Sequence, residues 1–275
     1  MPELPEVETV KRSLVPHLEN TVLSSVITRR KGLRIPFPEQ FSQKLSGKKI
    51  INITRRGKYL LIYLEEDLVL IIHLGMSGHI RVLQKNIPVP SKHDHIDFVT
   101  QNGVTIRYND PRRFGIVTLA KRETIGSHKL LRNIGPEPLS NSFNAVVLMK
   151  KLNGRNIAIK CALLDQKIVA GLGNIYVTES LFRSGISPKR LSKNISFKKA
   201  EKLVKMIRIV LTDAINAGGS TLNDHRRPDG KLGYFQYQFL VYGKNGELCG
   251  YCEKAKIQKI IQAGRSTFFC SNCQR

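Results

Sequence analysis

The sequence predicts an α+β protein, in which a helix and a β-rich sandwich or barrel precede a helical domain and a cysteine-rich hairpin. Three observations support this fold class. Short β-rich runs occupy the first half of the chain, and helical periodicity dominates the second. The 275 residues exceed one typical domain, which indicates two main domains. Four cysteines near the C-terminus are spaced in two close pairs.

The net charge predicts a polyanionic partner. The chain has 45 Lys and Arg residues against 21 Asp and Glu, a formal charge of +24, and its 41% of hydrophobic residues exclude a disordered basic tail. Charge alone leaves open a nucleic-acid enzyme, a ribosomal-type binder and a protein on anionic membranes. The apolar runs Tyr59–Leu64 and Leu68–Ile72 are far shorter than the roughly 20 residues of a spanning helix. The acidic start resembles no signal peptide, so we expect a cytoplasmic protein with no membrane partner.

The first half begins with a predicted helix over residues 3 to 18. Val7, Val10, Leu14 and Leu18 recur at helical intervals, and three glutamates lie near the positive end of the helix dipole. Short β-rich runs broken by Gly, Asn, Asp and Pro follow. They are Val22–Ile27, Lys49–Ile53, Tyr59–Leu64, Leu68–His73, Ile96–Val99, Val104–Tyr108 and Ile116–Leu119. Strands at such short intervals are typical of a sandwich or barrel.

A proline-rich segment separates the two halves. Residues 124–142 contain Gly135-Pro136-Glu137-Pro138, which disfavours helix and central strand and indicates a linker. Helical spacing then predicts Phe143–Leu152, Ile175–Ser184 and Phe197–Ala217, followed by a polar loop over Ser220–Gly233 and a β-rich end. The predicted organisation is a sandwich domain over 1–123, a linker over 124–142, a helical domain over 143–233 and a hairpin domain over 234–275.

The terminal cysteines predict one structural Zn²⁺ per chain. Cys249 and Cys252 form one C-x2-C pair, and Cys270 and Cys273 form another after 17 intervening residues. Four thiolates close a tetrahedral site, whereas disulfides are disfavoured in a reducing compartment. The strands Ala255–Ile261 and Ser266–Phe269 lie between the pairs, so the metal supplies folding energy to a hairpin too small for a core. The fifth cysteine, Cys161, is interpreted as a small buried residue.

Eight motifs in order carry a resemblance to a known family. They are MPELPEVETV (1–10), RRGKYL (55–60), HLGMSG (73–78), KHDHID (92–97), DPRRFG (110–115), GPEPL (135–139), AGLGNIY (170–176) and VYGKNGELC (241–249). The chain closely resembles the formamidopyrimidine-DNA glycosylases, which repair oxidised purines in bacteria. The resemblance implies a helix plus β-sandwich, a helix-two-turn-helix domain and a zinc-binding β-hairpin. It also implies a DNA glycosylase that removes 8-oxoguanine and formamidopyrimidines and cleaves the abasic strand by β,δ-elimination.

The resemblance assigns four catalytic residues. Once Met1 is removed, Pro2 has a free amine with a pKa near about 8, so a useful fraction is unprotonated at neutral pH and can form a Schiff base with the sugar. Glu3 is the implied proton donor for opening the sugar ring. Lys58 is implied as the acid and base of β-elimination, and Arg265 as the donor at δ-elimination. Without the resemblance, a helix cap is the simpler interpretation of Pro2 and Glu3, and a solvated turn that of Lys58 and Arg265.

The resemblance also implies how DNA is held. Met76, Arg112 and Phe114 correspond to the side chains that fill the gap left by an extruded base. The remaining implied DNA contacts are His93, Arg112, Arg155, Lys160, Asn174 and Tyr242. Asn174 opens a helix, where N–H groups can bind phosphate. The family's loop over the everted base matches Ser220–Tyr234, and Ser77 stands where some members carry Glu.

Two alternatives remain at this stage. One is an endonuclease VIII-like glycosylase for oxidised pyrimidines, although the start ELPEVET favours the purine enzymes. The other is a non-catalytic zinc-finger DNA-binding protein that retains the enzyme fold. In each case we expect a monomer that binds double-stranded damaged DNA in the nucleoid and needs no organic cofactor. The basic residues implied for DNA contact are expected to line one cleft. A metal site at His93-Asp94-His95 is disfavoured.

Overall fold

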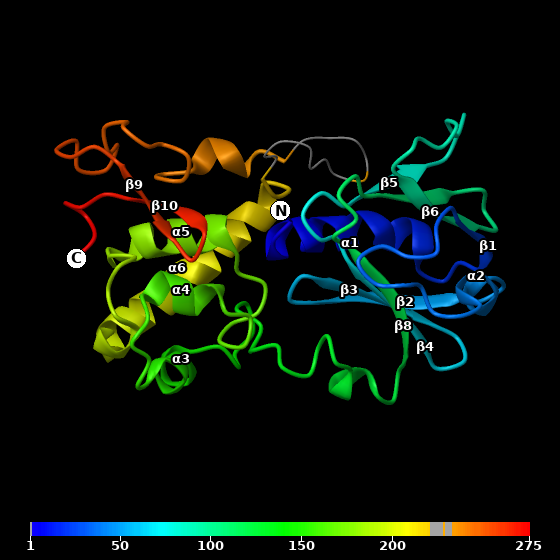
Figure 1. Ribbon diagram of the computed structural model, residues 1–275, viewed down its shortest axis with the longest axis horizontal. Coiled ribbons are helices and arrows are strands. Elements are labelled where there is room, and N and C mark those ends of the chain that lie inside the picture. Colours follow the sequence, from blue (N-terminus) through cyan, green and yellow to red (C-terminus); the bar gives the residue numbers. More distant parts are fainter. Residues whose placement is uncertain (1, 221–227, 229–232) are drawn as a thin grey trace. The chain divides into compact units, whose positions relative to one another are not determined.

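The chain forms two compact units in a computed structural model that describes residues 2–220, 228 and 233–275 (Figure 1). The first unit comprises Met1–Arg132 and Ala217–Tyr234, and the second comprises Asn133–Asn216 and Phe235–Arg275. The sequence prediction instead placed residues 217–233 in the helical domain. Hydrogen bonds explain the difference, because the Ser220 backbone binds Glu6 and the Pro228 carbonyl accepts from the Val82 N–H at 3.0 Å.

Two antiparallel sheets and one long helix build the first unit. One sheet has the order β2-β3-β4-β8 and the other β1-β6-β7-β5. The strands of the first sheet are β2 (Ile50–Arg56), β3 (Tyr59–Leu64), β4 (Leu68–His73) and β8 (Ile116–Lys121). Those of the second are β1 (Leu23–Thr28), β6 (Asp94–Thr100), β7 (Thr105–Asn109) and β5 (His79–Leu83). The predicted sandwich is therefore confirmed.

Helix α1 (Leu4–Leu18) lies between the two sheets (Figure 1). Its apolar stripe, predicted from Val7, Val10, Leu14 and Leu18, is buried in one core with residues of both sheets. Because this core covers one side of the helix along its length, the first turn is held in a fixed place. That turn carries the N-terminal residues that the sequence singles out.

The second unit is mainly helical. Its helices are α3 (Ala145–Leu152), α4 (Ile159–Leu164), α5 (Asn174–Ser184) and α6 (Phe197–Asn216), with 3-10 turns η2 (Ser192–Asn194) and η3 (Phe235–Gln238). The antiparallel strands β9 (Gln258–Gln262) and β10 (Arg265–Phe269) form the terminal hairpin. A small core around Phe182, Val241 and Phe268 joins the hairpin to α5. No helix among the described residues is long and apolar enough to cross a membrane.

Three short elements were not predicted. They are α2 (Phe41–Leu45), β5 and α4, besides the 3-10 turns η1 (Ile125–Ser127), η2 and η3. Each has six residues or fewer, and polar residues interrupt its apolar pattern. Strand β5 includes His79 and Arg81, whose polarity hides the buried Ile80 between them.

Candidate active site

The N-terminus of α1 holds the predicted nucleophile and acid. Pro2 and Glu3 are both buried, and Glu3 is only 2% exposed. Glu3 precedes the helix as its N-cap, and its backbone N–H donates to the Glu6 carboxylate at 2.9 Å. The other Glu6 oxygen accepts from the Ser220 N–H at 2.8 Å and the Ser220 hydroxyl at 3.0 Å. Glu6 therefore fixes the helix start to the first residue of the polar loop. Met1 and most of that loop lie outside the described residues.

Lys58 lies in the tight turn between β2 and β3 and is 7% exposed. Arg55 connects this turn to α1, because its Nε donates to Glu8 at 3.0 Å and its guanidinium donates to the Gly57 carbonyl at 2.9 Å. Burial raises the pKa of Glu8, but hydrogen bonds from Lys11 and Arg55 outweigh burial, so the pKa is lowered and the carboxylate stays charged. The Lys58 turn and the helix carrying Pro2 are thus held to each other by an ion pair.

His73, at the end of β4, is a neutral neighbour of this basic turn. Burial, followed by the charges of Lys58 and Arg34, lowers the pKa of His73 to about 4. The neutral ring accepts the Gly75 N–H at Nδ1 over 3.0 Å and packs on Tyr59 with ring centroids 4.7 Å apart. His73 therefore adds no charge beside Lys58 at neutral pH and fixes the start of the following loop.

The three predicted gap-filling residues lie on two neighbouring loops. Met76 is in the β4–β5 loop and Phe114 in the β7–β8 loop, and each is 43% exposed. Arg112 is exposed, with its guanidinium carbon 4.7 Å from the centre of the Phe114 ring. Large apolar side chains are normally buried, so their exposure beside an arginine favours a binding role over a core role.

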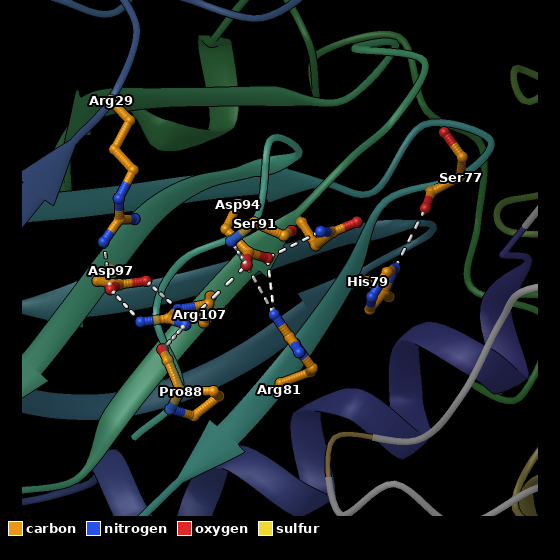
Figure 2. Close-up of polar contacts among 10 residues, drawn as sticks. Arg29, Ser77, His79, Arg81, Pro88, Ser91, Asp94, Asp97 and Arg107 are labelled. Atoms are coloured by element: carbon orange, nitrogen blue, oxygen red, sulfur yellow. Dashed lines mark hydrogen bonds and ion pairs between the residues drawn. The ribbon is translucent and has the colours of Figure 1, made fainter. Parts of the chain in front are cut away.

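A buried charge network holds the strand start next to His93 (Figure 2). Arg107 donates to both oxygens of Asp97 at 2.8 Å and to the Pro88 carbonyl at 2.7 Å. Arg81 contacts both Asp94 oxygens at 2.7 and 2.9 Å. Burial raises the pKa of Asp94, but hydrogen bonds from Asn109, Ser91 and Arg81 hold it well below its usual range. Asp94 is thus occupied by protein donors.

In the second unit, Arg265 and Asn174 lie at the terminal hairpin. Arg265 is exposed at the hairpin turn, opposite Gln262. The Asn174 amide donates to the Ser266 carbonyl at 2.9 Å and lies 3.5 Å from the Tyr242 hydroxyl, so α5 is tied to β10. Arg155 is exposed and contacts the Lys151 carbonyl at 2.8 Å.

Lys160 differs from its predicted place on a DNA-facing surface. Its side chain is fully buried, and its amine donates to the Thr267 hydroxyl at 2.6 Å and the Ser266 carbonyl at 3.1 Å. A buried ammonium needs such partners, since leaving it unpaired is costly. Lys160 therefore stabilises strand β10 of the hairpin through these two hydrogen bonds.

The four terminal cysteines form a site that could hold a metal ion. Their sulfur atoms all lie within 4.8 Å of one another, and no other group of this kind occurs among the described residues. The Cys249–Cys273 and Cys252–Cys270 sulfur separations are 3.9 and 3.7 Å. A tetrahedral zinc with bonds of about 2.3 Å separates its ligands by roughly 3.8 Å, so the geometry fits. Cys161 lies outside the cluster and is half-buried.

Sequence reasoning missed two buried carboxylates that organise these parts. Glu6 was counted only among the helix-start glutamates. Glu179, in the middle of α5, is fully buried and accepts backbone N–H groups from Leu240, Val241 and Tyr242 at 2.9–3.0 Å. The sequence does carry a signal for Glu179, because it lies among apolar residues such as Val177 and Leu181 that are expected to be buried. A charged side chain at such a position needs hydrogen-bond partners.

Comparison with known families identifies the chain. A model of the formamidopyrimidine-DNA glycosylase N-terminal domain matches residues 1–117, and a model of the formamidopyrimidine-DNA glycosylase H2TH domain matches residues 134–226. The chain belongs to the formamidopyrimidine-DNA glycosylase family. H2TH denotes the helix-two-turn-helix domain, so the resemblance carried by the sequence motifs is confirmed.

Curated relatives and solved structures of formamidopyrimidine-DNA glycosylases agree over the whole chain. The proteins of Rhodospirillum rubrum and Azorhizobium caulinodans are 51% and 49% identical, with all of each chain covered. A crystal structure of the Thermus thermophilus MutM (Fpg) protein matches at 38% identity and TM-score 0.88, covering 99% of this chain and 98% of that one. A Lactococcus lactis Fpg mutant in complex with Fapy-dG-containing DNA matches at 38% identity and TM-score 0.91, with complete coverage of both chains.

Proposed function

We propose that this glycosylase removes oxidised purines, 8-oxoguanine and formamidopyrimidines, from double-stranded DNA and then cleaves the abasic strand. The observation that carries the proposal is Pro2 at the chain start, followed by the buried Glu3 at the N-cap of α1. An N-terminal secondary amine beside a carboxyl group is the minimum pair for Schiff-base chemistry. The Fapy-dG complex of the Lactococcus lactis protein adds support for the purine substrate.

The proposed reaction begins with attack of the Pro2 nitrogen on the anomeric carbon, which breaks the bond to the damaged base. Glu3 protonates the ring oxygen as the sugar opens, leaving an iminium between Pro2 and the sugar. Lys58 then acts as base and acid in β-elimination, which breaks the bond to the 3′ phosphate. Arg265 donates to the leaving phosphate in δ-elimination on the 5′ side. Water finally hydrolyses the iminium and restores the Pro2 amine.

DNA binding is proposed to use exposed and half-buried basic and polar side chains. His93, Arg112 and Arg155 offer donors to phosphates, and Asn174 and Tyr242 do so beside the start of α5. Met76 and Phe114 enter the stack while Arg112 faces the unpaired base. Lys160 contributes through the hairpin that it supports. The net charge of +24 adds attraction to DNA, on which we propose that the protein acts as a monomer in the cytoplasm.

We further propose that the metal is a single zinc ion held by Cys249, Cys252, Cys270 and Cys273. The ion supplies structural stability to the hairpin rather than chemistry at the sugar. Four thiolate ligands leave no open position for water. The hairpin in turn holds Arg265 at its turn.

Borohydride trapping tests the catalytic proposal. The protein, with Met1 removed, is mixed with an abasic-site duplex and sodium borohydride, and the adduct is located by peptide mass spectrometry. We expect a covalent adduct on Pro2, and no adduct when a blocked N-terminus turns Pro2 into an amide. A matched control variant, Pro16→Ala, alters a proline inside α1, away from the chain start, and should still be trapped. A processed protein that binds damaged DNA without an adduct would identify a non-catalytic binder.

Substrate choice is tested separately. Excision is compared on duplexes containing 8-oxoguanine opposite C and thymine glycol opposite A. We expect faster excision of 8-oxoguanine. Strong preference for thymine glycol would instead support the endonuclease VIII-like alternative.

A further inference from the structure

Asp110 is a buried junction between two loops and a strand start. It follows β7 and is fully buried. Its Oδ2 accepts the Gly115 N–H at 2.8 Å, which closes the β7–β8 loop. Its own N–H donates to the His93 carbonyl at 3.1 Å, and its carbonyl lies 2.9 Å from His95 Nε2. The loop that carries Arg112 and Phe114 is therefore anchored to the residues around His93.

Ser77 extends this junction to the loop that carries Met76. The Ser77 hydroxyl donates to Asp110 Oδ1 at 2.6 Å and accepts the Arg112 N–H at 3.2 Å. The Ser77 hydroxyl thus donates one hydrogen bond to a carboxylate and accepts another from the backbone of the neighbouring loop. We name this pair of hydrogen bonds the Ser77–Asp110 clasp. Hydrogen bonds to an ionised group are stronger than neutral ones, so the clasp is a substantial restraint.

The loop backbones are also in direct contact. Gly75 has a φ of +65°, and a Cβ added there would lie 2.5 Å from the Phe114 carbonyl carbon and the Gly115 nitrogen. A Cβ on Gly115 would lie 1.8 Å from the Tyr108 hydroxyl. No side chain fits between the loops, so the backbone of one loop packs directly against the other. The Ser77–Asp110 clasp adds hydrogen bonds to this backbone contact between the two loops.

Met76 and Phe114 are exposed, so the restraint on their loops affects how readily these two side chains can enter a base stack. Met76 and Phe114 lie on the two loops that the clasp joins, and each remains 43% exposed. Exposed side chains on separate loops would each lose freedom on entering a base stack, and that loss opposes insertion. Two loops already joined through Ser77 and Asp110 need little further ordering.

We propose that the Ser77–Asp110 clasp is a positioning device that assembles Met76, Arg112 and Phe114 into one preformed wedge for base extrusion. Ser77 and Asp110 act through the wedge and touch no reacting atom. The inference rests on the proposed function, in which these three residues fill the stack. It concerns extrusion of the base, and it leaves the Schiff-base chemistry at Pro2 to the residues described above.

The test compares Ser77→Ala, Ser77→Thr and the matched control Ser24→Ala. Ser24 belongs to the same unit and donates its hydroxyl to the Val99 carbonyl, away from the clasp. Two single-turnover reactions are measured: excision of 8-oxoguanine from a duplex, and cleavage of a preformed abasic site, which has no damaged base to extrude. A 2-aminopurine beside the lesion reports unstacking by its fluorescence. Thermal unfolding verifies that each variant is folded.

For Ser77→Ala we expect excision and unstacking to slow about tenfold, the size of one lost charge-assisted hydrogen bond. Abasic-site cleavage should change less than about twofold. Ser77→Thr, which keeps a hydroxyl, should restore excision, and Ser24→Ala should match the parent protein. Equal slowing of both reactions, or unchanged unstacking, would overturn the clasp proposal alone. Failure of the parent protein to cleave the abasic site would overturn the proposed function as well.

Discussion

The carboxylate of Glu6 receives two hydrogen bonds from Ser220, 214 residues later in the chain, at 2.8 Å from the backbone N–H and 3.0 Å from the hydroxyl. Its other oxygen receives the Glu3 N–H at 2.9 Å. Every oxygen of this buried group thus faces a donor. The helix start that bears Pro2 and the beginning of the polar loop are therefore held by one side chain.

Replacing Glu6 by Gln should disturb this arrangement more than its small volume change suggests. The new NH₂ group must face at least one existing donor, so a buried bond is lost at a cost of about 1–3 kcal/mol. We expect a lower unfolding temperature and slower borohydride trapping on an abasic-site duplex. Ser220→Ala removes the hydroxyl bond alone and should have a smaller effect. Equal effects of the two variants would show that the backbone bonds contribute little.

Loss of one proposed zinc ligand should release the terminal hairpin. In Cys270→Ser, we expect the zinc content measured by a chelator-dye assay to fall from about one per chain, because structural zinc needs four closed ligands. Strand cleavage should fall with it. Cys161→Ser is the matched control, since Cys161 lies outside the cluster, and it should retain metal and activity. Full zinc content in Cys270→Ser would contradict the assignment of Cys270 as a ligand.

The hairpin turn leaves room for stabilisation at Ala263. Ala263 and Gly264 are the two central residues between Gln262 and Arg265, with φ values of 47° and 70°. Such turns favour Asn-Gly, because Asn tolerates positive φ better than Ala. Ala263→Asn should slow amide hydrogen exchange in β9 and β10, because it should raise the free energy of opening of the hairpin by about 1 kcal/mol. Ala263→Val, with a branched side chain, should accelerate exchange. The opposite order would contradict the turn geometry.

His73 predicts a pH dependence of stability. Its folded pKa is about 4, against 6.5 for the ordinary group. Between these values the unfolded chain binds a proton that the folded chain does not, so the free energy of unfolding falls as pH drops from about 6.5 to about 4. Below that range the His73 contribution is level. Its size is on the order of 3 kcal/mol.

Urea unfolding at several pH values measures this effect. His73→Asn keeps an acceptor for the Gly75 N–H and has no titration in the range, so its stability should vary less between pH 7 and pH 4.5. His17→Asn, in the last turn of α1, serves as a control for general loss of a histidine. An unchanged pH profile in His73→Asn would assign the dependence to other groups.

The elements with a clear apolar pattern were predictable from that local pattern alone. Tyr59–Leu64 and Leu68–His73 are identical in prediction and structure, and α6 differs from its prediction by one residue at its end. Apolar spacing over many residues has one low-energy solution, which buries one face. Strand β5 and helix α4 were not predicted because Arg81 and Lys160 interrupt their apolar patterns. Their charges are satisfied by Asp94 and by the hairpin, partners that lie far along the chain.

The same division applies to the site. The cysteine pairs were marked in the sequence by their spacing, and Pro2, Glu3 and Lys58 were marked by the family resemblance that the motifs carry. Only the tertiary structure decided that Lys160 is buried, that Glu6 binds Ser220, and that Ser77 and Asp110 join two loops. A hydrogen bond depends on distances of about 3 Å between atoms, and local sequence carries no record of contacts made across the chain.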